Sequence, residues 1–195
     1  MNIYPWPSDW TLERCSIMLD PNVRGFSSQY TKSFIAVDLI GEALVMTGRL
    51  SRARLADGGS REAFFNRLRG AHYVSAWHFA RPQPIGTQRG APTLSNDVLQ
   101  GASVLPLQGL TNGNTYKAGD MLGVGGQLFQ VADDVLVSGT TANVNTANRA
   151  RADIAIGSLV TWDKPTANWR IAEVVAVPYE DVFMMPFDIT LIQTW

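Results

Sequence analysis

The chain has 195 residues and carries 16 basic and 17 acidic side chains, which gives a net charge of −1. Hydrophobic residues make up 46% of it and charged residues 17%, so the composition predicts a globular protein with a buried core and excludes a highly charged disordered chain. Cys15 is the only cysteine, which excludes an internal disulfide and a metal site built from several thiolates.

The first fifty residues predict an extended arm followed by strands. The opening sequence MNIYPWPSDW lacks the basic and apolar regions of a secretory signal, and no apolar run in the chain reaches the roughly 20 residues of a membrane-spanning helix. We therefore expect a soluble protein that is made in a cytoplasm. Trp6 and Trp10 are large apolar groups that need a covering surface. Alternation predicts strands over 11–18, 30–38 and 43–50, with a turn at 20–22.

Residues 59–90 are the most distinctive stretch of the chain. Ser60 is the expected N-cap of one short helix, and Gly70 is its expected C-cap. Apolar side chains spaced three and four apart predict that this helix packs on a sheet. These are Phe64, Phe65 and Leu68, and the arginines expected on the opposite face are Arg61, Arg67 and Arg69. The aromatic segment 73–79 predicts a strand, which the following prolines end.

Between residues 91 and 167, short apolar segments alternate with turn signals. Segments 121–124 and 128–131 are predicted to form a hairpin through Gly125 and Gly126. Further strands are expected over 102–110, 135–144 and 154–162, and this pattern is typical of a small barrel or sandwich. The chain is predicted to end in two more strands, over 169–177 and 181–194.

Charge is unevenly placed along the chain. The segment from Arg49 to Arg89 contains eight arginines and two acidic residues. The segment from Glu173 to the end contains four acidic residues and no basic one. Two interpretations stay open: complementary faces that dock copies of the chain around a ring, or charges that pair inside one subunit. The candidate interface residues are Arg49, Arg52, Arg54, Arg61, Arg67, Arg69, Glu180, Asp181 and Asp188.

The sequence carries no constellation typical of catalysis or cofactor binding. Cys15 has no local nucleophile signature, and His72 and His78 lack a third ligand at metal spacing. The segment starting at Gly123 lacks the Gly-Lys-Ser/Thr of a phosphate-binding loop. Arginines interleaved with aromatic residues are also found in nucleic-acid-binding proteins, but the aromatic residues here alternate as core residues do. We therefore expect no enzyme activity, no cofactor and no metal.

The order of three motifs resembles the distal tail proteins of long-tailed bacteriophages. The first is SREAFFNRLRG at 60–70, followed by an aromatic strand that ends in FARPQPIG at 79–86. The second is the hairpin YKAGDMLGVGGQLFQV at 116–131 with the strand LVTWDKP at 159–165, which is similar to an inserted module of related tail proteins. The third, PFDITLI at 186–192, resembles the closing strand of that family. The resemblance extends from about residue 49 to the end.

This resemblance implies a mostly β protein with one short helix. A discontinuous β-sandwich belt domain would comprise residues 1–90 and 168–195, and a small β-barrel-like domain of oligonucleotide/oligosaccharide-binding or galectin type would be inserted at 91–167. In that family six belt domains form a ring in the virion, at the tail tip. The implied partners are other copies of the chain, the tail-tube protein, and hub, tape-measure or receptor-binding proteins. DNA only passes through the channel, no membrane is involved, and no catalytic residue is implied.

A second hypothesis is a carbohydrate-binding β module that recognises a bacterial surface. Its site would be an exposed tryptophan or tyrosine that stacks on a sugar, with asparagine and aspartate around it. Trp162 and Trp169 are the tryptophans nearest to the central module. Trp162 lies in an alternating segment and is expected in the core.

Overall fold

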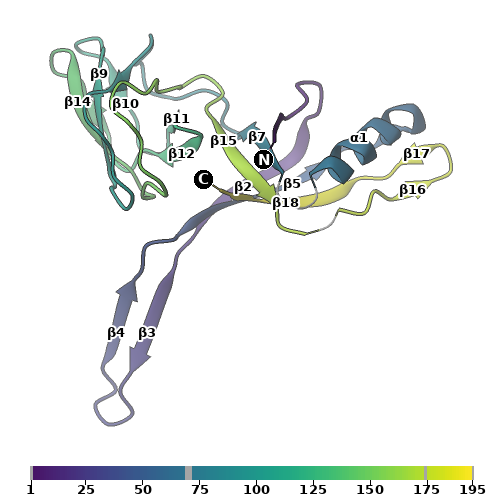
Figure 1. The fold of residues 1–195 in the computed structure, drawn as a ribbon, viewed down its shortest axis with the longest axis horizontal. Coiled ribbons are helices and arrows are strands. Elements are labelled where there is room, and N and C mark those ends of the chain that lie inside the picture. Colours follow the sequence, from purple (N-terminus) through teal and green to yellow (C-terminus); the bar gives the residue numbers. More distant parts are fainter. Residues whose placement is uncertain (1, 69–71, 174, 195) are drawn as a thin grey trace.

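The computed structural model describes residues 2–68, 72–173 and 175–194. The prediction of a mostly β chain with one short helix is confirmed, because the described residues form many strands and the single helix α1 (Leu55–Arg67). Figure 1 shows a main sheet beside α1, a group of small sheets on the other side, and a long two-stranded hairpin that projects from the body. None of the described helices is both long and apolar enough to cross a membrane.

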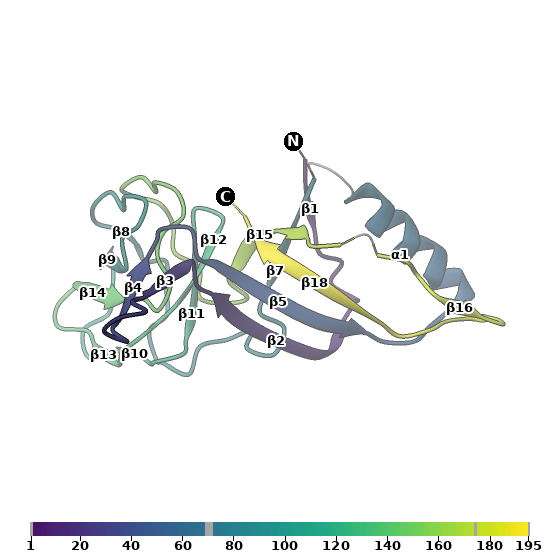
Figure 2. The ribbon, with the colours of Figure 1, turned by 90° about the horizontal axis from the view of Figure 1, so that it is seen from below.

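The main sheet has six strands, and segments far apart in sequence meet in it. In spatial order they are β1 (Ile3–Pro5), β7 (Tyr73–Trp77), β15 (Thr166–Ile171), β18 (Phe187–Gln193), β5 (Ala43–Leu50) and β2 (Leu12–Asp20). β1 runs parallel to β7, and all other neighbours are antiparallel. The predicted strands at 11–18, 43–50 and 73–79 therefore lie in one sheet, as Figure 2 shows from below.

One face of this sheet is covered by aromatic side chains from the N-terminal arm and from α1. Trp6 and Trp10 are buried, and their rings meet edge-on at 6.0 Å between centroids. Phe65 stacks on Trp10 at 6.2 Å, and the indole of Trp169 lies in the same core. The surface that the two N-terminal tryptophans require is thus the inner face of the sheet together with the helix.

Helix α1 begins earlier than the sequence predicts. Its N-cap is Arg54, and Ser60 lies inside the helix, where its hydroxyl donates to the Asp57 carbonyl at 2.7 Å. The extra residues are helical although Arg54 provides no side-chain cap, because Gly58 packs against Met184 of β17 (Phe183–Met184) and against Tyr179. A Cβ at Gly58 would come within 2.8 Å of the Tyr179 ring, so tertiary packing decides this helix start. The expected C-cap, Gly70, lies outside the described residues.

A second hydrophobic core lies between the small sheets. Their strands are β8 (Thr93–Leu94), β9 (Val104–Gln108), β10 (Thr115–Tyr116), β11 (Met121–Val124), β12 (Gln127–Gln130), β13 (Val135–Leu136) and β14 (Thr141–Asn145). These strands pair as β14-β9-β8, β10-β13 and β11-β12, and they do not close into a barrel. The strand expected over 154–162 is present only as isolated bridges, such as Leu159 with Thr93.

The predicted hairpin through Gly125 and Gly126 is confirmed. Both glycines have positive φ, 58° and 74°, the backbone that a two-residue hairpin turn requires. Side chains alternate across this hairpin: Met121 and Leu128 belong to the first core, and Leu122 belongs to the second. The hairpin therefore connects the two cores, and the division of the chain into domains at 90/91 and 167/168 stays a prediction.

Two further hairpins extend from the main sheet at different ends of the molecule (Figure 1). One pairs β3 (Val23–Ser27) with β4 (Phe34–Asp38) and continues the β2–β5 ribbon outward. The predicted turn at 20–22 is thus a break within one long ribbon and not a reversal of the chain. The other pairs β16 (Tyr179–Glu180) with β17 (Phe183–Met184), and β17 also pairs with β6 (Ala53–Arg54) beside α1.

Candidate functional site

The β3–β4 hairpin, here called the arm, exposes large apolar side chains along its whole length. Phe26, Phe34 and Ile35 are between 63% and 68% exposed, and Tyr30 near the tip is 98% exposed. Phe26 and Ile35 are cross-strand partners and therefore share one face of the ribbon. Phe34 lies on the other face, over Gly25. Both faces of the arm thus present apolar groups to solvent.

The base of the arm is held against the second group of sheets. The Arg149 side chain forms an ion pair with Asp38, and its backbone N–H donates to the buried Glu42 carboxylate. The Asn22 side chain donates to the Ile40 carbonyl at 3.2 Å, and the Leu39 N–H donates to the Asn22 carbonyl at 2.9 Å. These contacts determine the direction in which the arm leaves the body, although nothing in the described chain covers its outer part.

A two-stranded ribbon without a covered face is marginally stable in water. Exposed apolar patches of this kind mark interaction sites in soluble proteins, and unpaired strand edges are ready to pair with another chain. The arm is therefore the strongest candidate interaction surface of the described chain.

Sequence reasoning does not identify the arm as a site. Its apolar residues follow the alternation of an ordinary half-buried strand, which predicts that the segment 30–38 lies in a sheet. A usable signal is the segment 27–33, which is polar except for Tyr30 and separates the two strands of the arm.

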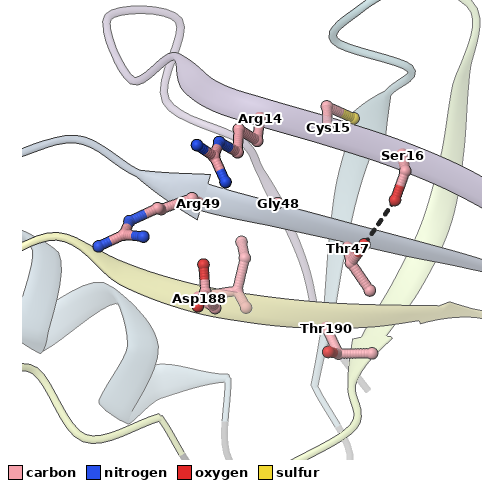
Figure 3. Close-up of a pocket in the computed structure, with 9 residues that line it drawn as sticks. Arg14, Cys15, Ser16, Thr47, Gly48, Arg49, Asp188 and Thr190 are labelled. Atoms are coloured by element: carbon pink, nitrogen blue, oxygen red, sulfur yellow. Dashed lines mark hydrogen bonds between the residues drawn. The ribbon is translucent and has the colours of Figure 1, made fainter.

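Three charged side chains surround a hollow of about 450 Å³ on the outer face of the main sheet (Figure 3). Arg49 on β5 lies opposite Asp188 on β18 and opposite Arg14 on β2. The hydroxyls of Ser16 and Thr47, 2.7 Å apart, line the same hollow. We call this the arginine hollow. Arg49 and Asp188 are thus brought together by strand register, whereas Arg14 is not among the sequence candidates.

The structure separates the remaining arginine candidates. Arg61, expected on the polar face of the helix, is instead buried, and its Nη1 donates to the Ser51 carbonyl at 2.8 Å. Its position above the Trp10 ring, 5.5 Å from the centroid, explains how a cation is accommodated there. Arg52 covers the Phe183 ring at 3.7 Å, and Arg67 is exposed on α1.

The remaining candidate interface residues that the structure describes lie on β6 and at the β16–β17 hairpin. Arg54 is exposed opposite Phe183, and Glu180 and Asp181 are exposed at the tip of the β16–β17 hairpin. Arg69 lies outside the described residues. The basic and acidic segments therefore meet along β5, β6, β17 and β18, but within the described chain the ion pairs closer than 4.0 Å are Lys117–Asp134 and Arg149–Asp38.

Cys15 is partly buried and His78 is buried, and both contact backbone groups. Burial raises the pKa of the Cys15 thiol, although backbone hydrogen bonds from Ala80 and Phe79 partly oppose this. His78 is buried, which lowers its pKa, and its Nδ1 accepts the Arg81 N–H at 3.1 Å. The described residues contain no group of three histidine, cysteine or acidic side chains that could hold a metal ion.

The raised pKa of Cys15 predicts slow alkylation of the folded chain. Less thiolate is present at a given pH than in the unfolded chain, and only the thiolate reacts. We expect iodoacetamide at pH 8 to modify native protein several-fold more slowly than protein in urea, as followed by mass spectrometry. Equal rates in both states would contradict this environment for Cys15.

The tryptophans considered for carbohydrate binding are both engaged within the fold. The Trp162 Nε1 donates to the Gly90 carbonyl at 2.8 Å, and the Arg89 guanidinium lies 4.8 Å from the ring centroid. Trp169 is fully buried. Trp169 therefore offers no face for stacking on a sugar, and Arg89 covers one face of the Trp162 ring. Comparison with models of known protein families found no match for this chain, and comparison with curated proteins found none.

Proposed function

We propose that this protein is a structural component of a bacteriophage tail tip. Copies of the chain form a ring that joins the tail tube to the hub or receptor-binding proteins around the DNA channel. The order of the three sequence motifs supports the family, and the exposed apolar arm supports an assembly role. A protein that works alone has no use for such an arm, because solvent exposure of Phe26, Phe34 and Ile35 favours aggregation.

The arm is the single observation that carries this proposal. An isolated ribbon gains its missing packing when a neighbouring subunit covers one face or extends one edge. Its base is fixed to the body by Asp38 and Arg149, so the ribbon is oriented before its partner arrives. For the carbohydrate-binding alternative, the two tryptophans named from the sequence are engaged within the fold.

Removing the apolar groups of the arm is expected to abolish assembly without unfolding the body. We expect the wild-type chain to form particles of six copies of 21.4 kDa, about 128 kDa, with an open centre. The variant Phe26→Ser/Phe34→Ser/Ile35→Thr is expected to remain a monomer with an unchanged melting temperature, because these side chains are exposed in the free chain. Light scattering and negative-stain microscopy measure both states.

A matched control changes three equally exposed apolar residues on the second group of sheets. Leu136, Ile156 and Leu159 are 55% to 69% exposed, and Leu136→Ser/Ile156→Thr/Leu159→Ser is expected to assemble like the wild type. A wild-type chain that stays monomeric at every concentration, or an arm variant that still forms rings, would contradict the proposal.

A further inference from the structure

We propose that the acidic tip of the β16–β17 hairpin of one copy docks in the arginine hollow of the next copy. The inference rests on the proposed ring and names a contact that would hold neighbouring subunits together. It follows from two surfaces of opposite charge that the fold places apart and leaves without partners in one chain.

The arginine hollow carries an excess of positive charge. Arg14 and Arg49 are direct cross-strand neighbours on β2 and β5, and like charges placed opposite each other destabilise a sheet. Asp188 is the only carboxylate among the residues that line the hollow, and no acidic oxygen of the described chain lies within 4.0 Å of either guanidinium. Two guanidinium groups and a single carboxylate thus lie around a cavity of about 450 Å³, and the carboxylate is within ion-pair distance of neither guanidinium.

The hollow has the chemistry to bind carboxylates. Arginine donates two parallel hydrogen bonds to a carboxylate, and such charge-assisted pairs are stronger than neutral ones. The hydroxyls of Ser16, Thr47 and Thr190 line the same cavity and supply further donors. Figure 3 shows the two arginines on neighbouring strands, with Asp188 on the strand beyond.

The β16–β17 tip is an exposed acidic projection. Glu180 and Asp181 are exposed, and Asp181 adopts a positive φ of 51° at the turn. Val182 beside them is 62% exposed. The hairpin is held in place because the Tyr179 hydroxyl donates to Glu62 of α1 at 3.0 Å and β17 pairs with β6.

The tip cannot fill the hollow of its own chain. The hairpin runs outward beside α1, away from the outer face of β2, β5 and β18 (Figure 1). Docking between two different surfaces of identical chains is head-to-tail, and such contacts close into rings when the rotation permits. The partner that fits the hollow is therefore a second copy of this chain.

Charge reversal tests the contact. The hollow variant Arg14→Glu/Arg49→Glu and the tip variant Glu180→Arg/Asp181→Arg are each expected to raise the dissociation constant of assembly at least about tenfold. An equimolar mixture of the two variants is expected to assemble again, because each tip then meets a hollow of opposite charge. Analytical ultracentrifugation at low and high salt measures these states, and salt is expected to weaken the wild-type assembly.

Matched changes elsewhere serve as the control. Arg67→Glu and Asp163→Arg reverse exposed charges outside both surfaces and are expected to leave assembly unchanged. If the double hollow variant unfolds, because the carboxylate introduced on β5 would lie beside Asp188, the single Arg14→Glu variant keeps the test intact. If both charge-reversal variants still form rings, this docking contact is wrong, while the proposed ring is retained. A wild type that does not assemble would overturn both.

Discussion

Replacing Trp169 with alanine is expected to lower the free energy of unfolding by about 3–5 kcal/mol. Trp169 is fully buried at the centre of the main sheet, opposite Val74 on β7 and Gln193 on β18. Its Nε1 donates to the Ala76 carbonyl at 2.9 Å, so truncation leaves a cavity and also removes one buried hydrogen bond. Native domains are stable by only about 5–15 kcal/mol, so this single change removes a large part of the total.

Urea unfolding followed by circular dichroism measures this loss. Trp162→Ala is the matched control, because that indole is only partly buried and donates one hydrogen bond, to the Gly90 carbonyl. We expect it to cost about 1–2 kcal/mol. Equal losses at the two tryptophans would contradict the central place of Trp169 in the first core.

Replacing Asp120 with alanine is expected to cost more than about 3 kcal/mol. This side chain is only 3% exposed, and its two oxygens accept the backbone N–H groups of Ile85 at 2.7 Å, Gly86 at 3.0 Å and Lys117 at 2.9 Å. Hydrogen bonds to a charged group are the strong kind, and their loss leaves three donors without a partner. These bonds tie the segment that leaves the main sheet to the second group of sheets.

Amide hydrogen exchange localises the effect. We expect the Ile85 and Gly86 amides to exchange faster in Asp120→Ala. Amides of the main sheet are expected to lose only the protection that corresponds to the lower free energy of global unfolding. The control is Asp133→Ala, an exposed aspartate that accepts one hydrogen bond, from Asn145 at 3.2 Å. It is expected to cost no more than about 1 kcal/mol. Unchanged exchange at Ile85 and Gly86 would show that Asp120 does not anchor this segment.

Sequence reasoning fails where neighbours far along the chain decide the outcome. Capping rules place the start of α1 at Ser60, yet Gly58 packs on Tyr179 and Met184, more than a hundred residues away. Helical spacing assigns Arg61 to the polar face, yet the helix turns that side toward Trp10 and Ser51. Local rules describe the small free-energy differences between cap residues or between positions of a charged side chain. The packing of the helix on distant residues contributes more free energy than these local preferences and decides the outcome.

Features that depend on a few adjacent residues follow from the amino-acid sequence alone. The hairpin at Gly125 and Gly126 is predictable because only glycine adopts both positive φ values without strain. The mostly β content and the strand over 43–50 are predictable from period-two alternation. Each of these features is set by backbone sterics or by the pleat of a strand.

Which surfaces stay free is a property of the folded chain. The alternation of Phe34, Ile35 and Val37 is the same for a strand covered by a core and for an arm in solvent, because alternation reports a preference for burial and not its fulfilment. Likewise, Arg14, Arg49 and Asp188 gather only through the register of three strands. Register depends on pairing between distant segments, so the candidate interfaces of this protein exist only once the main sheet has formed.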